Sequence, residues 1–147
     1  MNIETNDDPL VSVVIPMYQA EDWILDTLAS VAAQTYPQVE TIVVDDGSTD
    51  WGAQLVAEFA ESADMPLHLI RSENQGVSSA RNRGIAESTG PLVALLDADD
   101  RWLPLKLELQ VARMAQSNAP MCLCGYELVA DQTGRRVGVV NARDGPR

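Results

Sequence analysis

The chain has 147 residues, 46% of them hydrophobic, which suits one globular domain with a sizeable core. Its net charge is −12, and residues 1–70 hold thirteen Asp and Glu but no Lys or Arg, so nucleic acid and anionic lipid are poor partners. Apolar runs are short and the start MNIETNDDP is typical of neither a signal nor a transit peptide, so we expect no transmembrane segment. We expect a cytoplasmic protein, with the inner face of the membrane as a further location.

Hydrophobic periodicity predicts strands that alternate with helices along most of the chain. In chain order we expect a strand at 11–16, a helix at 20–34, a strand at 40–46, a helix at 50–62, a strand at 67–71, a helix at 76–88, a strand at 91–97, a helix at 103–116, and two strands at 121–128 and 135–140 joined by a turn at DQTG, 131–134. Strands alternating with helices indicate a parallel sheet with right-handed crossovers.

Two cysteines, Cys122 and Cys124, lie in the segment MCLCGYEL, within the predicted strand at 121–128. On a strand their side chains would point to the same face. No His and no further Cys lies near them in the sequence, so we expect small buried apolar residues rather than a metal site.

Chemically distinctive groups follow three of the predicted strands. PMYQ follows the first strand, DDGSTD the second and DADD the fourth, and in a parallel sheet all three meet at the rim where ligands bind. Carboxylates without His or Cys select hard cations such as Mg²⁺ or Mn²⁺. Asp97 and Asp99 can both reach one ion, while Asp100 can cap the following turn. An acidic loop and helix cap remains the alternative for DADD.

Other parallel-sheet proteins fit less well. The turn after the first strand, PMYQAED, has no glycine, which excludes a dinucleotide-binding fingerprint. The single lysine, Lys106, lies outside any P-loop pattern and inside a predicted helix, which also disfavours a phospho-receiver domain.

Three segments together resemble the inverting family 2 glycosyltransferases: VSVVIPMYQAEDWILDTLASVAAQTYPQVETIVVDDGSTD, NQGVSSARNRGIAESTG and LVALLDADDRWLPLKLELQ. The resemblance runs from about Val11 to about Gln110 and contains four motifs in order. It implies a GT-A fold, which is a Rossmann-like α/β sandwich of a parallel sheet with helices on both faces, here truncated. Trp51 departs from the family pattern, which usually has a small residue at that point of the DDGSTDG stretch.

The resemblance also implies site residues. Pro16 and Tyr18 would line the base pocket of a nucleotide-diphosphate sugar, usually a UDP-sugar, and Asp45 would accept a hydrogen bond from the uracil imide. Gly76 and Arg81 would approach the nucleotide. The family's D-x-D motif corresponds to Asp97, Ala98 and Asp99: Asp97 would hold the ribose or a metal-bound water, and Asp99 would bind Mn²⁺ or Mg²⁺ directly.

The predicted function is transfer of a sugar from this donor to a glycan or lipid-linked acceptor in envelope polysaccharide synthesis. We expect residues 1–147 to form a single nucleotide-sugar-binding domain without the C-terminal acceptor half. None of Glu108, Glu127, Asp131 and Asp144 matches the family's general base, so the catalytic residue stays unknown. A nucleotide-sugar-binding module without turnover, or an inactive fragment, is the alternative, and a GT-A-like nucleotidyltransferase is a weaker one. Exposed apolar surface would favour self-association.

Overall fold

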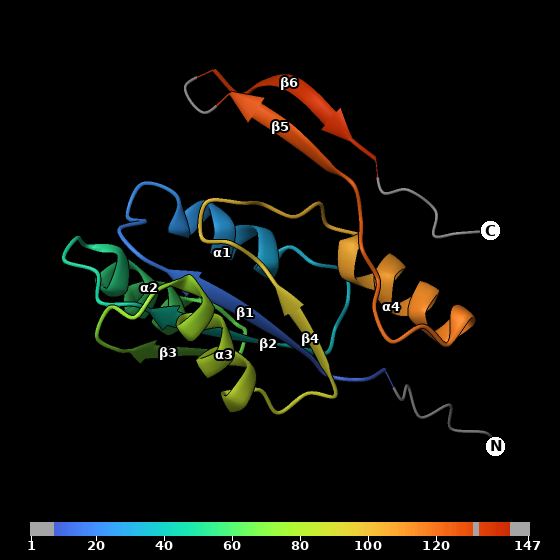
Figure 1. Ribbon diagram of the computed structural model, residues 1–147, viewed down its shortest axis with the longest axis horizontal. Helices are drawn as coiled ribbons and strands as arrows, with labels where there is room; N and C mark the ends of the chain where they lie inside the picture. Colours follow the sequence, from blue (N-terminus) through green and yellow to red (C-terminus); the bar gives the residue numbers. More distant parts are fainter. Residues whose placement is uncertain (1–7, 131–132, 142–147) are drawn as a thin grey trace. The chain divides into compact units, whose positions relative to one another are not determined.

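The computed structural model describes residues 8–130 and 133–141 of the chain (Figure 1). The chain divides into two compact units, residues 1–105 and 106–147. The first unit holds β1 (Val11–Met17), α1 (Ile24–Ala32), β2 (Val39–Asp45), α2 (Gly52–Ser62), β3 (Leu67–Arg71), α3 (Val77–Glu87) and β4 (Leu92–Leu95), and the second holds α4 (Lys106–Ser117), β5 (Tyr126–Ala130) and β6 (Arg135–Val140).

A four-stranded parallel sheet forms the centre of the first unit, with the strand order β3-β2-β1-β4. Every residue of β1 is buried, as is every residue of β2 except Val39, because β-branched side chains on both faces pack against helices. From β1 the chain moves outward through β2 to β3 and then crosses back to place β4 on the other side of β1. The order therefore reverses between β1 and β4, where ligands bind in open α/β sheets.

Helices cover both faces of this sheet (Figure 1). A Cβ added at Gly84 of α3 would lie 2.3 Å from Val14 Cγ1 and 3.3 Å from Val44 Cγ2, so α3 packs closely on the face to which these two valines point. A Cβ at Gly52 of α2 would instead meet Met17 Sδ at 3.4 Å. Met17 and Val14 lie on opposite faces because strand side chains alternate. With α1 packed against α2, the predicted arrangement of helices on both faces is confirmed.

At the end of the sheet where the parallel strands begin, the side chain of Glu40 on β2 connects β1 with the segment before β4. Its buried carboxylate accepts hydrogen bonds from Ser12 Oγ at 2.5 Å, Thr89 N at 2.8 Å and Gly90 N at 3.3 Å. Burial alone would raise the pKa of Glu40, but these hydrogen bonds outweigh it and lower the pKa below its ordinary value. This network holds the start of β1 and the approach to β4 in register with β2.

Several predicted helices and strands were longer than those in the structure. The first helix begins at Ile24 and not at residue 20, because Gln19 has φ 50° and the amides of Trp23 and Ile24 both donate to the carbonyl of Ala20 in a separate turn. The fourth helix begins at Lys106 and not at residue 103. The fourth strand ends at Leu95, so the DADD segment forms a loop beyond it.

In the second unit, β5 and β6 form an antiparallel pair, as predicted for the last two strands. The strand predicted at 121–128 was wrong in its first half, because β5 begins only at Tyr126. Cys122 is half-buried and Cys124 is exposed, so neither is a buried strand residue as expected. Gln110 Nε2 on α4 lies 3.4 Å from the carbonyl oxygen of Cys122, so this segment bonds to the helix. Of the predicted turn at 131–134, residues 131–132 lie outside the described residues.

Within the part of the chain that the structure describes, no helix combines the length and the apolar character needed to cross a bilayer.

Candidate functional site

A cavity of about 390 Å³ opens in the first unit beyond the carboxyl ends of β1 and β4, at the point where the strand order reverses. Side chains from the end of β1, the loop after it, α3 and the loop after β4 line it: Pro16, Tyr18, Ala20, Trp23, Val77, Arg81, Asp97, Ala98 and Asp99. The structure thus brings together six of the eight predicted site residues, including both proposed metal ligands.

The main chain of the loop with Asp97, Ala98 and Asp99 is hydrogen-bonded to a side chain of α1. The hydroxyl of Thr27, which is fully buried on that helix, lies 2.8 Å from the carbonyl oxygen of Ala98 and 2.8 Å from that of Asp100. Within the loop, the amide of Asp100 donates to the carbonyl of Asp97 at 3.1 Å, which closes a turn. Both carboxylates that line the cavity therefore come from a loop with fixed main-chain hydrogen bonds.

Arg81 reaches the same loop from α3. Its Nη2 donates to Asp97 Oδ1 at 2.6 Å, and both side chains are partly exposed toward the cavity. Its buried Nε has no hydrogen-bond partner among the described residues. The guanidinium therefore brings positive charge to one wall of the cavity and keeps donor capacity for a bound anion.

A second cavity of about 320 Å³ shares Pro16, Tyr18 and Val77 with the first. It extends along β1 toward the start of α3 and is further lined by Met17, Asp46, Asn74, Gly76 and Ala80. Pro16, Tyr18 and Val77 therefore lie where the two cavities adjoin.

Gly76 precedes α3 with φ 92°, a left-handed conformation that glycine adopts without strain. The amides of Gln75 and Gly76 donate to the two carboxylate oxygens of Asp46 at 2.9 and 2.8 Å. Asp46 is thus tied to the loop that leads into α3, on the face of the sheet that α3 covers.

Asp45, which the sequence assigns to the uracil, lies in neither of these two cavities. Its carboxylate is fully buried and accepts from Ser48 N at 2.9 Å and from Arg71 Nε at 3.0 Å. The next residue, Asp46, lines the second cavity instead. The sequence predicted no ligand role for Asp46. The alternation of side chains along β2 would have separated the two, because Val44 and Asp46 fall on the α3 face.

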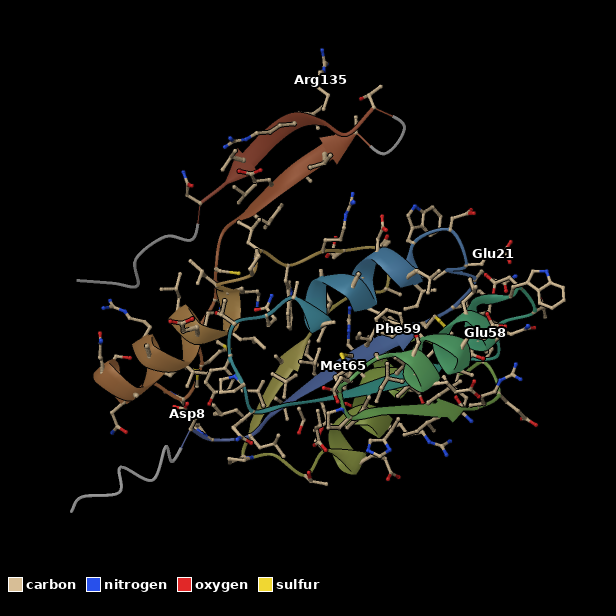
Figure 2. All side chains as sticks on the ribbon, turned by 180° about the vertical axis from the view of Figure 1, so that it is seen from behind. Asp8, Glu21, Glu58, Phe59, Met65 and Arg135 are labelled. Carbon is tan, nitrogen blue, oxygen red and sulfur yellow. The ribbon has the colours of Figure 1, made fainter. Side chains whose placement is uncertain are left out.

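The loops after β1 and β2 are joined at this rim of the sheet. Gln19 Oε1 accepts from Thr49 N at 2.8 Å, Glu21 N donates to Asp50 Oδ2 at 2.9 Å, and Glu21 Oε2 accepts from Trp51 N at 2.8 Å. Figure 2 labels Glu21, which stands at this rim near the start of α2. Asp50 Oδ1 accepts from Gly52 N, at the first residue of α2, at 3.0 Å.

Asp100 differs from the two aspartates before it, because it does not line the first cavity. Partial desolvation raises its pKa, and the negative charges of Asp99 and Asp97 add to the effect. Three carboxylates so close repel one another, so a bound cation would stabilise this loop.

The carboxylates present fit a hard divalent cation. In the described part of the chain, no group of three or more His, Cys, Asp or Glu side chains is arranged to hold a metal ion. Asp97 and Asp99 would supply at most two ligands. That number suits Mg²⁺, which takes one or two protein carboxylates and fills its shell with water and substrate phosphates.

Glu108 and Glu127, two of the four acids that do not match the family's general base, belong to the second unit. Glu108 is exposed on α4, and Glu127 pairs with Arg136 at 3.2 Å in the second unit. Asp131 and Asp144 lie outside the described residues.

The fold and the cavities define an α/β domain with two adjoining cavities at a carboxylate-lined rim of its parallel sheet. Known proteins of this class are similar to it. The family model "Glycosyl transferase family 2" matches residues 12–142. The putative teichuronic acid biosynthesis glycosyltransferase TuaG of Bacillus subtilis is 41% identical over 86% of this chain and 50% of its own length. The Escherichia coli UDP-Glc:alpha-D-GlcNAc-diphosphoundecaprenol beta-1,3-glucosyltransferase WfgD is 37% identical, over 84% of this chain and 48% of its own length.

Solved structures of glycosyltransferases are also similar to this chain. S. aureus TarS 1–349 in complex with UDP matches with a TM-score of 0.69 and 29% identity, covering 74% of this chain and 33% of that one. The mannosyltransferase PcManGT from Pyrobaculum calidifontis, in complex with GDP-Man and Mn²⁺, matches with a TM-score of 0.68 and 31% identity, covering 82% and 35%. The chain belongs to glycosyl transferase family 2, a family of enzymes, and its predicted GT-A fold class is confirmed. It spans about half the length of TuaG and WfgD.

Proposed function

We propose that this chain is the donor-binding part of a glycosyltransferase that takes a sugar from a nucleotide-diphosphate sugar, UDP-linked in our proposal. The acceptor would be a glycan or a lipid-linked glycan in envelope polysaccharide synthesis. The observation that carries the proposal is the first cavity, where Asp97, Asp99 and Arg81 meet beside Pro16 and Tyr18.

Each end of the joined cavities suits one part of such a donor. In the second cavity, Asp46 offers carboxylate oxygens that can accept from the imide N–H of a uracil, and Tyr18 offers a ring face. We assign the base contact to Asp46, because it lines the second cavity and each of its oxygens keeps a second lone pair beside the bonds from Gln75 N and Gly76 N. We assign a supporting role to Asp45, which lines neither cavity and is bonded to Ser48 and Arg71. Gly76 leaves room beside the nucleoside, since a Cβ there would meet no atom within 4 Å.

The diphosphate would lie in the first cavity. Mn²⁺ or Mg²⁺ held by Asp97 and Asp99 would neutralise the phosphates and stabilise the leaving nucleoside diphosphate. Arg81 would donate to a phosphate oxygen from the opposite wall, while Ala98 keeps the two aspartates apart in the loop. Without a countercharge, the acidic surface of residues 1–70 would repel an anionic donor.

Similar proteins support the choice of donor class. S. aureus TarS has been solved with UDP and with UDP-GlcNAc, and PcManGT with GDP-Man and Mn²⁺. TuaG is described as a putative teichuronic acid biosynthesis glycosyltransferase, and the name of WfgD includes a diphosphoundecaprenol-linked GlcNAc. A place in the cytoplasm, at the inner face of the membrane, follows from such an acceptor and is part of the proposal, as is self-association of the 147-residue chain.

Calorimetric titration of the chain with UDP, with Mn²⁺ and then with EDTA, tests the proposal. We expect binding in Mn²⁺ that weakens by at least about tenfold in EDTA, because the metal is the main countercharge for the diphosphate. ADP and CDP are the matched controls for the base and should bind more weakly than UDP. Equal affinity with and without metal would contradict the metal role, and no nucleotide binding at all would contradict the proposed function.

A nucleotide-sugar-binding module without turnover is the second candidate, because no general base is assigned among Glu108, Glu127 and the undescribed Asp131 and Asp144. Acceptor-dependent release of UDP from a panel of UDP-sugars by the 147-residue chain would exclude the module. Donor binding without release agrees with both candidates, because the chain spans about half the length of TuaG and WfgD.

A further inference from the structure

Thr27 has a role that its position in the helix does not predict. Its side chain is fully buried on α1, in line with Ile24 and Leu28, and a threonine in such a row usually packs as a small core residue. Its hydroxyl oxygen lies 3.4 Å from the carbonyl of Trp23, four residues earlier, which is the usual partner of a helical threonine. Two carbonyls outside the helix lie closer, so the hydroxyl serves the neighbouring loop.

These two carbonyls belong to Ala98 and Asp100, each with its oxygen 2.8 Å from Thr27 Oγ1. The Ala98 carbonyl belongs to the peptide directly before Asp99, and the Asp100 carbonyl belongs to the peptide directly after Asp100, so the two bracket Asp99 and Asp100. A hydroxyl has one hydrogen, so it donates to one of them at a time, but both peptide planes must face it. The peptide between Asp99 and Asp100 is held by the bond from Asp100 N to the Asp97 carbonyl at 3.1 Å, so both peptides that flank Asp99 are oriented and the main chain sets the direction of its side chain.

A second hydroxyl on the same face of α1 extends this support. Ser30 Oγ donates to the carbonyl of Thr27 at 2.7 Å and accepts from Trp102 N at 3.1 Å. Thr27 and Ser30 are three residues apart and therefore lie on one side of the helix. The loop from Ala98 to Trp102 is thus attached to α1 at both ends of the segment that contains Asp99 and Asp100.

We propose that Thr27 is a positioning residue for Asp99, acting through the main-chain carbonyls of Ala98 and Asp100, which bracket Asp99 and Asp100. The inference rests on the proposed function, since Asp99 is taken as the ligand of the divalent cation. Groups that orient a metal ligand typically affect metal affinity by 10- to 100-fold when removed. Loss of the Thr27 hydroxyl should therefore weaken Mn²⁺ binding by roughly tenfold without changing any side chain in the cavity.

The test compares Thr27→Val, which keeps the shape but removes the hydroxyl, with Thr27→Ser, which keeps the hydroxyl. Mn²⁺ affinity in the presence of UDP is measured by electron paramagnetic resonance of free Mn²⁺, and the melting temperature is measured without metal. We expect about a tenfold loss of Mn²⁺ affinity in Thr27→Val and near-wild-type affinity in Thr27→Ser. Should Thr27→Val not fold, Thr27→Cys carries the test, with an intermediate loss expected because a thiol is a weak donor.

Thr41→Val is the matched control. Thr41 is also fully buried, on β2, and its hydroxyl has no hydrogen-bond partner among the described residues. The same substitution there should leave Mn²⁺ affinity unchanged. If Thr27 is purely structural, Thr27→Val will lower the melting temperature but keep the wild-type Mn²⁺ affinity. That result would overturn this inference and leave the proposed function intact. Failure of the wild-type chain to bind Mn²⁺ with UDP would overturn the proposed function and this inference with it.

Discussion

At the scale of single residues, the three carboxylates of the DADD segment have different surroundings. Asp97 lines the cavity and is ion-paired to Arg81, Asp99 lines the cavity, and Asp100 lies outside it with a raised pKa. A cation in the cavity would meet Asp97 and Asp99 first. Position relative to the cavity, and not the number of charges, therefore separates the metal ligands from the third acid.

Asp99→Asn should remove most of the metal-dependent part of UDP binding, with a loss of at least about tenfold, because the variant lacks a direct ligand. It should also leave the metal-free chain as stable as the wild type or slightly more stable, since it relieves repulsion among three close carboxylates. Asp100→Asn makes the same charge change one residue further and is the control. Titration calorimetry and thermal melts measure both effects. A larger loss of UDP affinity in Asp100→Asn would show that the assignment within DADD is wrong.

The sequence could name most of the predicted residues that line the cavities but not the direction of each side chain. Resemblance to the family pointed to Asp45, the first acid of DDGS, and the structure turns this residue toward Arg71 and puts Asp46 at the cavity. Thr27 could not be recognised at all, because its partners are main-chain carbonyls 71 and 73 residues away. Contacts of this kind have no local sequence signal.

At the scale of elements, alternation of apolar strands and amphipathic helices predicted every strand and helix of the first unit in the right order. Errors arose where a local contact overrides periodicity. The separate turn at Ala20 moves the start of α1 to Ile24. Strand β4 ends at Leu95, and the last backbone bond of the run LVALL to β1 is from Leu96 N to the Val14 carbonyl at 3.1 Å. In the second unit, the apolar segment MCLC matched a strand pattern, although its residues precede β5 and bond to α4.

The close packing of α3 on the sheet connects the fold to the site. Gly84 lets α3 approach β1, and the same helix carries Val77 and Arg81 into the cavity. Gly84→Ala would place a methyl group 2.3 Å from Val14 Cγ1, so the helix must move outward. We expect a net destabilisation of about 1–2 kcal/mol, because overpacking outweighs the gain in helix propensity. The displaced Arg81 should also weaken UDP binding.

Urea unfolding and UDP titration of Gly84→Ala check both effects. Asn82→Ala, at an exposed position of the same helix, raises helix propensity without meeting the sheet and serves as the control. Gly84→Ala that equals Asn82→Ala in stability would mean that α3 does not rest on the sheet as closely as the structure shows.

At the scale of the whole molecule, the charge is unevenly distributed. No Lys or Arg precedes Arg71, and three arginines of the first unit are paired with Asp45, Asp97 and Asp26 at 3.0, 2.6 and 3.2 Å. The net charge of −12 therefore acts against the compact state through self-repulsion, and any cation should relieve part of it. A specific metal site must be separated from this general effect.

Thermal melts in NaCl and in MnCl₂ make that separation. NaCl should raise the melting temperature gradually between about 0.1 and 1 M, as screening shortens the range of the repulsion. Mn²⁺ should act at far lower ionic strength and saturate, with about 2.7 kcal/mol of stabilisation at a hundred times its dissociation constant. Asp99→Asn should abolish the saturable part and keep the NaCl response. Asp64→Asn, at an exposed position between α2 and β3, changes the net charge equally and should retain both responses. A Mn²⁺ effect that matches NaCl at equal ionic strength, or that survives in Asp99→Asn, would mean that divalent cations act on this chain only as general counterions.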